Sequence, residues 1–155
     1  MYIKNMTIRP IQPTDYACVE ELVKAAILEI NAKVYSQPII ERMLSVDPYR
    51  PRTTLHEREY FVALIEGEVR GVVGMKENEV KTFFVDPNYH GEGVGTKLIS
   101  HIEKLISKQG YSKSIVFSTI SAQSFYENQG YAVIREVISD IDGEKMLRFY
   151  MEKKL

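Results

Sequence analysis

A glycine-rich turn, HGEGVG at residues 90–95, is the segment of this sequence with the clearest potential for chemistry. It opens a helical pattern of apolar residues at Val94, Leu98, Ile102, Leu105 and Ile106. Backbone N–H groups at the start of a helix point the same way, and the helix dipole adds partial positive charge there. Glycines also let a phosphate approach the backbone closely. The turn therefore predicts a pyrophosphate-binding site.

Two common phosphate motifs do not fit this turn. A Walker A loop needs Gly-Lys-Ser/Thr at its end, whereas Gly95 is followed by Thr96 and Lys97. A dinucleotide fingerprint needs glycine at its sixth position, which is Thr96 here if Gly91 and Gly93 are taken as the first two. The turn also follows a run of expected antiparallel strands. Both nucleotide-binding interpretations are therefore disfavoured.

A second segment, SAQSFYENQGY at residues 121–131, supplies an independent pattern. Together with the first turn it resembles the GCN5-related N-acetyltransferases (GNAT). Their acyl-CoA loop has Gln or Arg, two residues, Gly, one residue, then Gly or Ala, and their later motif has Ala, an aromatic-Tyr-Glu run, Gly and an aromatic residue. The resemblance covers about residues 59–131, and two motifs in the right order are strong evidence.

The resemblance implies that the chain binds acetyl-CoA as a cosubstrate. In the family, the fourth strand splays and its backbone pairs with the pantetheine arm, which corresponds here to Phe83, Phe84 and Val85. The loop would then hold the pyrophosphate through His90, Gly91, Glu92, Gly93, Val94, Gly95 and Thr96. Thr119 stands where the family often has Asn, so contacts there are expected to differ. His90 replaces Gln or Arg, so a phosphate contact from its ring would weaken as pH rises near neutrality.

For catalysis, the resemblance places Tyr126 where the family's general acid protonates the departing CoA thiolate. A phenol has a pKa near ~10 and stays protonated at pH 7. The acceptor amine must lose a proton, and Glu79 stands where the histone-acetylating branch carries its base. Glu79 shares the strand face of Phe83 and Val85 if no bulge intervenes, although a strand-end glutamate in a turn is as good an interpretation. His56 and Glu57 are other candidates.

The hydrophobic periodicity before the first motif predicts helices followed by strands. Met6 to Arg9 is β-prone, Asp15 to about Asn31 is an amphipathic helix, and a short helix starts near Ser36. Residues 45–58 carry two prolines and many polar groups, and they are expected to form a loop. Strands are expected at 59–65, 69–76 and 79–85, joined by tight turns.

After the glycine turn, a long helix is expected to end near Gly110, followed by a strand over 113–118. Ser121 can cap a short helix that Gly130 ends. The last two strands form a hairpin about Asp142-Gly143. The order is β-α-α-β-β-β-α-β-α-β-β. With the resemblance, it predicts an α+β, three-layer GNAT-like fold with a mixed, mostly antiparallel, splayed sheet and helices on both faces.

Length and composition exclude several classes of protein. The 155 residues suit one domain over 1–155. A net charge of −1 offers no footprint for nucleic acid. Cys18 is the single cysteine, which fits a reducing compartment, and no apolar run approaches a membrane span. We expect a cytoplasmic protein without membrane, nucleic-acid or metal partners, and the sequence leaves room for a homodimer.

The predicted activity is transfer of an acetyl group from acetyl-CoA to a primary amine by direct attack, with the Val85 N–H as oxyanion donor. The alternative is a catalytically silent acyl-CoA-binding or partner-binding module on the same fold. The amine acceptor, a small molecule or a peptide, stays open. Its site is expected from residues 31–58 and the 140–144 hairpin, with Tyr35, Tyr49, Arg50, Arg52 and His56 as candidates.

Overall fold

The computed structural model describes residues 5–45 and 51–155. Its strands are β1 (Met6–Pro10), β2 (Glu59–Ile65), β3 (Glu68–Lys76), β4 (Glu79–Val85), β5 (Lys113–Thr119), β6 (Ala132–Ile141) and β7 (Glu144–Lys154). Its helices are α1 (Tyr16–Glu29), α2 (Gln37–Ser45), α3 (Pro51–Thr54), α4 (Val94–Lys108) and α5 (Gln123–Asn128). Short 3₁₀ turns stand at Pro13–Asp15 (η1), Asn31–Lys33 (η2), Pro87–Tyr89 (η4) and Ile120–Ala122 (η5).

The predicted α+β class and element order are confirmed, with one addition. The segment expected to be a loop contains the short helix α3, Pro51–Thr54. Proline is compatible with the first turn of a helix because that position needs no N–H partner, and this is why a proline-rich stretch does not exclude a helix. Residues 46–50 of the expected loop lie outside the described residues.

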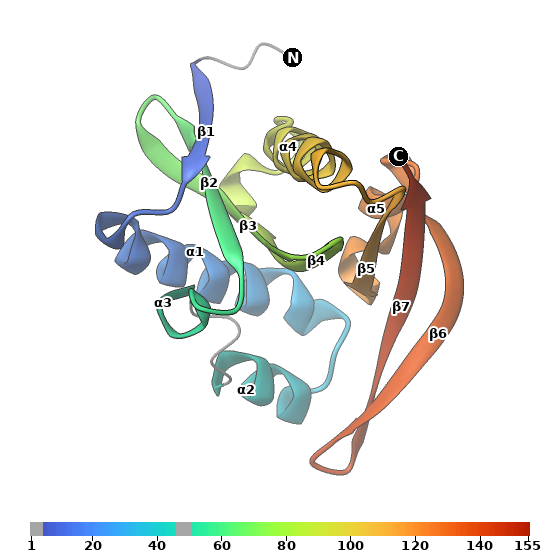
Figure 1. Ribbon diagram of the computed structural model, residues 1–155. Helices are drawn as coiled ribbons and strands as arrows, with labels where there is room; N and C mark the ends of the chain where they lie inside the picture. Colours follow the sequence, from blue (N-terminus) through green and yellow to red (C-terminus); the bar gives the residue numbers. More distant parts are fainter. Residues whose placement is uncertain (1–4, 46–50) are drawn as a thin grey trace.

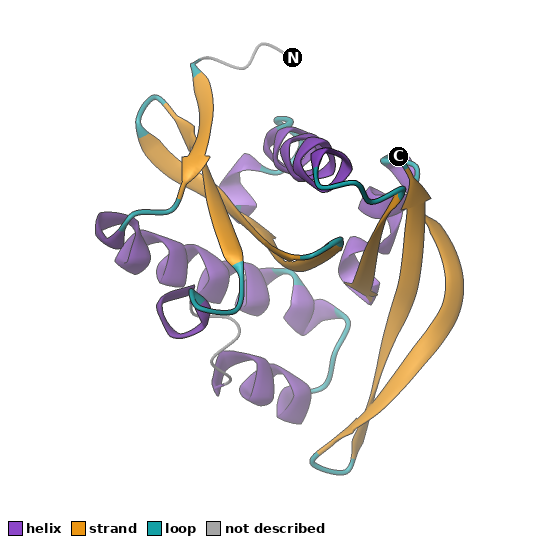
Figure 2. Ribbon diagram, viewed as in Figure 1, coloured by secondary structure: helices purple, strands orange, loops and turns teal. Residues whose placement is uncertain are grey.

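The sheet has the strand order β1-β2-β3-β4-β5-β7-β6, and each neighbouring pair except β4–β5 is antiparallel. Figures 1 and 2 show α4 on one face of the sheet and α1 with α2 on the other. One apolar cluster joins the sheet to α4 through Leu98, Ile102 and Ile106. A second joins it to α1 and α2 through residues such as Ile27 and Ile40. These two cores fix the sheet between its helical layers.

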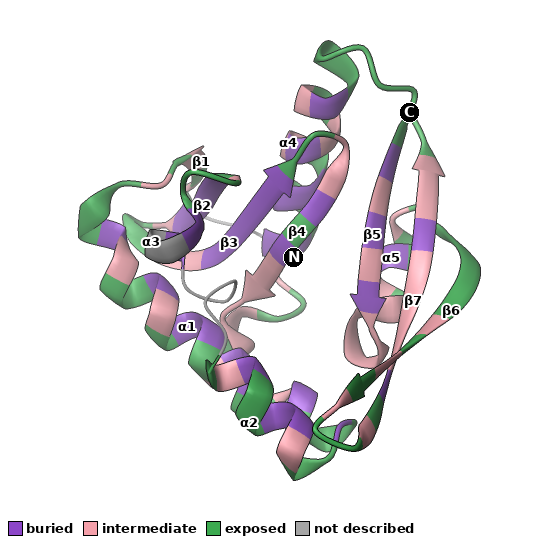
Figure 3. Ribbon diagram, turned by 60° about the horizontal axis from the view of Figure 1, so that its bottom comes forward, coloured by how far each residue is buried: buried purple, intermediate pink, exposed green. Residues whose placement is uncertain are grey.

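The parallel contact between β4 and β5 is short. Only Glu79↔Ile115 and Val80↔Val116 pair, and beyond them the strands separate, as Figure 3 shows. Both strands continue for several residues, to Val85 and Thr119. The predicted splay of the sheet is thus confirmed, and it leaves the second half of β4 without a strand on that side.

A β-bulge in β4 changes the orientation of its first residues. Gly74 pairs with Thr82 and Met75 with Val80, so Lys81 is an extra residue. Val80 packs in the same cluster as Phe83 and Val85, on the α4 face. Its neighbour Glu79 therefore takes the opposite face. The expectation that Glu79 shares a face with Phe83 and Val85 depended on an unbroken alternation, and it is wrong because of this bulge.

Candidate active site

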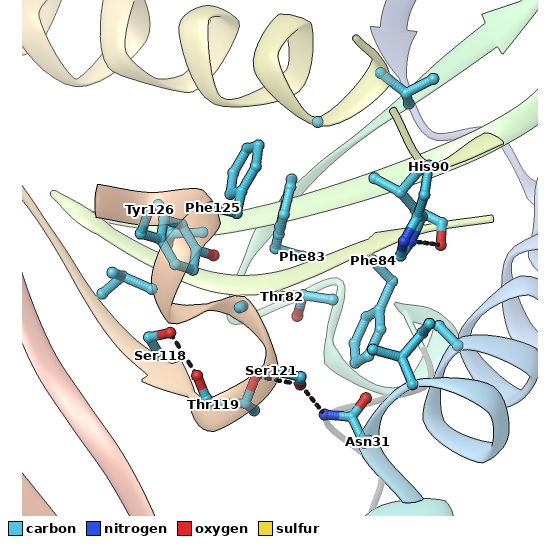
Figure 4. A pocket seen from close by; sticks show the side chains of 18 of the residues that line it. Asn31, Thr82, Phe83, Phe84, His90, Ser118, Thr119, Ser121, Phe125 and Tyr126 are labelled. Atoms are coloured by element: carbon cyan, nitrogen blue, oxygen red, sulfur yellow. Dashed lines mark hydrogen bonds between the residues drawn. The ribbon is translucent and has the colours of Figure 1, made fainter. Parts of the chain in front are cut away.

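An open cavity of about 540 Å³ lies where β4 and β5 separate, and Figure 4 shows part of its lining. Its walls come from the second half of β4, the start of α4, the end of β5, and α5. The end of α1 and the following turn, η2, also contribute through Ala26, Ile30 and Asn31. The splay of the sheet therefore creates the space, and segments far apart in the sequence enclose it.

The cavity gathers most of the residues that the sequence singled out. Glu92, in the glycine turn, and Glu79 are not among its lining residues. The candidates that do line it are Phe83, Phe84, Val85, His90, Gly91, Gly93, Val94, Gly95, Thr96, Thr119 and Tyr126.

The glycine turn presents backbone donors to this cavity. Gly91 and Gly93 have φ of 81° and 86°, in the left-handed region that glycine adopts without strain. Gly93 is the N-cap of α4, and the first backbone bond of the helix runs from Lys97 N to Gly93 O at 3.1 Å. The N–H groups of the first turn, at Val94, Gly95 and Thr96, therefore have no partner within the helix. Such a cluster of donors can hold a pyrophosphate.

A side chain at Gly95 would crowd the aromatic wall of the cavity. A Cβ there would lie 3.0 Å from Phe83 Cζ and 3.1 Å from the ring of Phe125. The two rings stack with their centroids 5.1 Å apart. Glycine at this position thus lets the first turn of α4 sit directly against the aromatic wall of the cavity.

At alternate residues of β4, the backbone N–H and C=O groups point away from β3, toward the gap between β4 and β5. Asp86 N donates to Arg70 O at 2.8 Å across the pair Gly71↔Val85. This pattern belongs to a non-hydrogen-bonded antiparallel pair, so the N–H and C=O of Val85 point away from β3. The N–H and C=O of Phe83, two residues earlier, also point away from β3. Those of Phe84 point toward β3, where it pairs with Val72. Phe83 and Val85 can thus pair with an extended ligand, and Phe84 contributes its side chain.

His90 ties the glycine turn to the end of β4. Its Nε2 lies 3.2 Å from the carbonyl oxygen of Val85, and the ring lines the cavity (Figure 4). An N–H on Nε2 donates to that carbonyl in either the neutral or the protonated ring. The side chain thereby fixes the distance between the loop donors and the strand backbone. The expected contact between His90 and a phosphate stays a prediction.

Tyr126 stands in the aromatic wall on α5. Only 3% of the residue is exposed, and its ring packs beside Phe83, Phe125 and Tyr131 at centroid distances of 5.7, 5.5 and 5.4 Å. Burial raises the pKa of Tyr126 far above its ordinary value. Its hydroxyl makes no hydrogen bond within the described part of the chain, and in Figure 4 it points toward Phe83. It is therefore a protonated donor available to a ligand.

Tyr131, the neighbouring tyrosine, has a structural role. Its hydroxyl donates to Ser114 Oγ at 2.8 Å in the core. Ser121, by contrast, does not cap α5 as expected, because η5 intervenes and Ala122 is the N-cap. Ser121 Oγ instead lies 3.1 Å from Thr119 Oγ1 and accepts a bond from Asn31 Nδ2 at 3.1 Å (Figure 4). All three of these hydrogen-bonded residues line the cavity.

The three candidate bases from the sequence, Glu79, His56 and Glu57, do not line the cavity. Glu79 Oε2 is 3.3 Å from Lys81 Nζ, and of this pair only Lys81 lines the cavity. The His56 side chain is 75% exposed and its Nε2 lies 3.5 Å from Glu57 Oε1. Neither His56 nor Glu57 is a lining residue.

The expected acceptor residues are only partly placed. Tyr35 is buried, and its hydroxyl donates to Leu147 O at 2.6 Å while accepting from Ile120 N at 2.9 Å, which is a structural bridge. Tyr49, Arg50 and the side chain of Arg52 lie outside the described residues. The 140–144 hairpin contributes no lining residue.

Asn31 lines the cavity and is the first residue of the range 31–58 expected to form the acceptor site. The charged lining residues Lys81 and Arg148, and the hydroxyl side chains of Thr82 and Ser118, were not singled out by the sequence. Lys81 enters through the bulge, and Arg148 comes from β7, the strand that pairs with β5. No motif marks these positions. Over residues 5–45 and 51–155, no group of three or more His, Cys, Asp or Glu side chains is arranged to hold a metal ion. Within the same ranges, no helix has the length and apolar character needed to cross a membrane.

Comparison with known proteins identifies the same family along most of the chain. Residues 31–153 match the model of the acetyltransferase (GNAT) domain. The uncharacterized N-acetyltransferase YafP of Escherichia coli strain K12 is 26% identical over 152 residues, which cover 98% of each chain. A GCN5-related N-acetyltransferase from Rhodopseudomonas palustris, "Aminotransferase, Class-II", superposes with a TM-score of 0.89 at 26% identity, covering 100% of this chain and 99% of that one.

The fold is also shared with more distant structures. PaiA N-acetyltransferase from Thermoplasma acidophilum, solved in complex with coenzyme A, has a TM-score of 0.73 at 21% identity. That likeness covers 97% of this chain and 99% of the other.

Proposed function

This chain belongs to the GNAT family of acetyltransferases, and we propose that it transfers the acetyl group of acetyl-CoA to a primary amine by direct attack. The observation that carries the proposal is the splay between β4 and β5, which opens one cavity onto both the first turn of α4 and Tyr126. Coenzyme A in the PaiA structure, which shares the fold, supports the choice of cosubstrate.

For the cosubstrate, the backbone donors at Val94, Gly95 and Thr96 hold the pyrophosphate, with Gly91 and Gly93 letting it approach. The pantetheine arm then lies along β4 and pairs with the backbone groups of Phe83 that point away from β3. The carbonyl of Val85 is bonded to His90, and its N–H is left for the thioester oxygen. His90 holds the loop and the strand at a fixed separation. The thioester reaches the splay beside Tyr126.

In the reaction, the amine nitrogen attacks the thioester carbonyl carbon, and the Val85 N–H stabilises the negative oxygen that forms. The C–S bond then breaks, and the CoA thiolate receives the proton of the Tyr126 hydroxyl. The nitrogen gives up one proton, which returns through water to the Tyr126 phenolate and restores its hydroxyl. Cys18 is exposed on α1 and does not line the cavity, which supports direct attack without an acyl-enzyme.

The test is release of free CoA thiol from acetyl-CoA over a panel of primary amines, with acetylated product identified by mass. Turnover with at least one amine, above the rate without acceptor, is the expected result. A silent acyl-CoA-binding module would bind acetyl-CoA in the same assay and release thiol with none of them. That outcome would replace the transferase with the alternative.

Because Glu79 does not line the cavity, we propose that it takes the ammonium proton only through water, and this role gives a separate prediction. Glu79→Gln is expected to lower kcat/KM roughly tenfold or more near neutral pH. The loss should shrink as pH rises, because more of the acceptor is then free amine. Coenzyme A affinity should stay within about threefold, under ~1 kcal/mol.

The ion pair between Glu79 and Lys81 supplies the control for that experiment. Lys81→Gln removes the same ion pair and keeps the carboxylate. If both variants shift the pH–rate profile alike, loss of the ion pair and not loss of the base explains the effect. If the profile of Glu79→Gln overlays the parent's, Glu79 is a surface residue and not the base.

For the chain as a whole, we propose a single catalytic domain over residues 1–155, acting in the cytoplasm. The lone cysteine supports a reducing compartment. A homodimer is consistent with the exposed apolar residues of β6, such as Ile134 and Ile138. Sedimentation of the purified protein measures that state directly.

A further inference from the structure

An arginine without a carboxylate partner lines the cavity. Arg148 comes from β7, and its Nε is buried without a hydrogen-bond partner. Its guanidinium carbon lies 5.6 Å from the centroid of the Phe117 ring. No Asp or Glu within the described ranges lies at ion-pair distance from it. The residue as a whole is half-buried in the cavity wall, so a ligand that supplies an acceptor for the guanidinium is stabilised there.

The charge of the cavity points the same way. Its lining contains Lys81, His90 and Arg148 but no Asp and no Glu. Lys81 already has Glu79 at 3.3 Å, whereas Arg148 has no such neighbour among the residues that the structure describes. An acceptor carrying only positive groups would meet a like charge with nothing to offset it. An acceptor that also carries an anion would neutralise Arg148.

A chain of hydrogen-bonded lining residues lies next to this arginine. Thr119 is the cross-strand partner of Arg148 in the β5–β7 ladder. Thr119 Oγ1 lies 3.1 Å from Ser121 Oγ, which accepts from Asn31 Nδ2 at 3.1 Å (Figure 4). Because Asn31 uses its Nδ2 in this chain, its Oδ1 is the acceptor that it can offer to a ligand. A cation and a neutral acceptor thus flank the same end of the cavity.

We propose that the acceptor is a small amino acid whose carboxylate binds the guanidinium of Arg148 and whose amine donates to Asn31 Oδ1. The planar fork of arginine matches a carboxylate with two parallel hydrogen bonds. The cavity of about 540 Å³ must hold the pantetheine arm as well, which favours a small acceptor over a protein chain. The proposal rests on the proposed acetyl transfer and specifies its substrate class.

The test compares free amino acids, α and ω, each with its own carboxamide, as acceptors in the thiol-release assay. The parent protein is expected to prefer the acid over its carboxamide by at least about tenfold in kcat/KM. In Arg148→Gln the ratio of kcat/KM for the acid to kcat/KM for the carboxamide should fall toward one, chiefly through a higher KM for the acid. Arg148→Lys, which keeps the charge and loses the fork, should recover only part of it.

Arg135→Gln is the matched control. Arg135 is an arginine on the adjacent strand β6, exposed and 4.9 Å from the Tyr150 ring, and it does not line the cavity. Its variant should retain the preference for acids. Thermal unfolding with and without acetyl-CoA shows whether each variant is folded.

Two results would overturn the inference. If the parent acetylates carboxamides with the same efficiency as the acids, Arg148 does not bind a carboxylate, while the proposed acetyl transfer stands. If neither set is acetylated, the amino-acid assignment is also wrong, and the broader amine panel decides separately whether the chain is a transferase.

Discussion

Replacing Tyr126 with phenylalanine is expected to lower kcat by about 100-fold or more, which corresponds to roughly 2.7 kcal/mol of transition-state stabilisation. The variant keeps the ring that packs beside Phe83 and Phe125 and loses only the hydroxyl. Because the proton is needed as charge develops on the sulfur, coenzyme A affinity should be nearly unchanged. Steady-state kinetics and a coenzyme A titration measure the two quantities separately.

The pH dependence adds a second check on Tyr126. Burial raises the pKa of Tyr126 above its ordinary value, so the hydroxyl keeps its proton through and beyond the range near ~10 where a solvated phenol loses it. The parent's kcat should therefore show no loss from this group between neutrality and about pH 10. A decline there that is absent from Tyr126→Phe would contradict this assignment of the proton.

Tyr131→Phe is the matched control for that variant. It removes a second buried hydroxyl from the same aromatic group, one that donates to Ser114. It should cost about 1 kcal/mol of stability and leave kcat unchanged. If Tyr126→Phe keeps the parent's kcat, water or another residue protonates the thiolate.

Local signals explain why so much of the fold could be predicted from the sequence. Glu66-Gly67 and Asp142-Gly143 sit between β-prone runs, and all four residues have positive φ, as tight hairpin turns require. The apolar spacing of α4 places Leu98, Ile102 and Ile106 in the core. The glycine turn could also be predicted, because glycine tolerates positive φ wherever it occurs, and Gly91 and Gly93 both adopt it.

The features that could not be predicted depend on register between distant strands. The bulge at Lys81 is set by how β4 pairs with β3, and a single extra residue moves Glu79 to the other face. Arg148 reaches the cavity because β7 pairs with β5 so that Arg148 stands opposite Thr119. The alternation within either strand carries no information about that pairing. The acceptor end of the site is therefore where the sequence was least informative.

The second large effect concerns the glycine turn. Acetyl-CoA at about 100 times its Kd is expected to stabilise the parent by about 2.7 kcal/mol and to raise Tm by roughly 5–10 °C. NADH and ATP at equal concentration should have little effect, because the turn lacks the sequence patterns that those ligands need. Gly93→Val should abolish the acetyl-CoA shift, since its side chain would occupy the space of the pyrophosphate at the N-cap of α4.

Gly93→Val also strains the backbone, and a matched variant separates the two effects. Gly143 has φ of 87° against 86° for Gly93, and a Cβ there would meet no atom within 4 Å. Gly143→Val therefore carries a similar backbone cost, about 1–3 kcal/mol, at a hairpin far from the loop in sequence. Both variants should unfold at lower temperature than the parent, but only Gly93→Val should lose the response to acetyl-CoA. If Gly93→Val keeps that response, or if ATP stabilises the parent as much as acetyl-CoA does, the pyrophosphate does not bind at this turn.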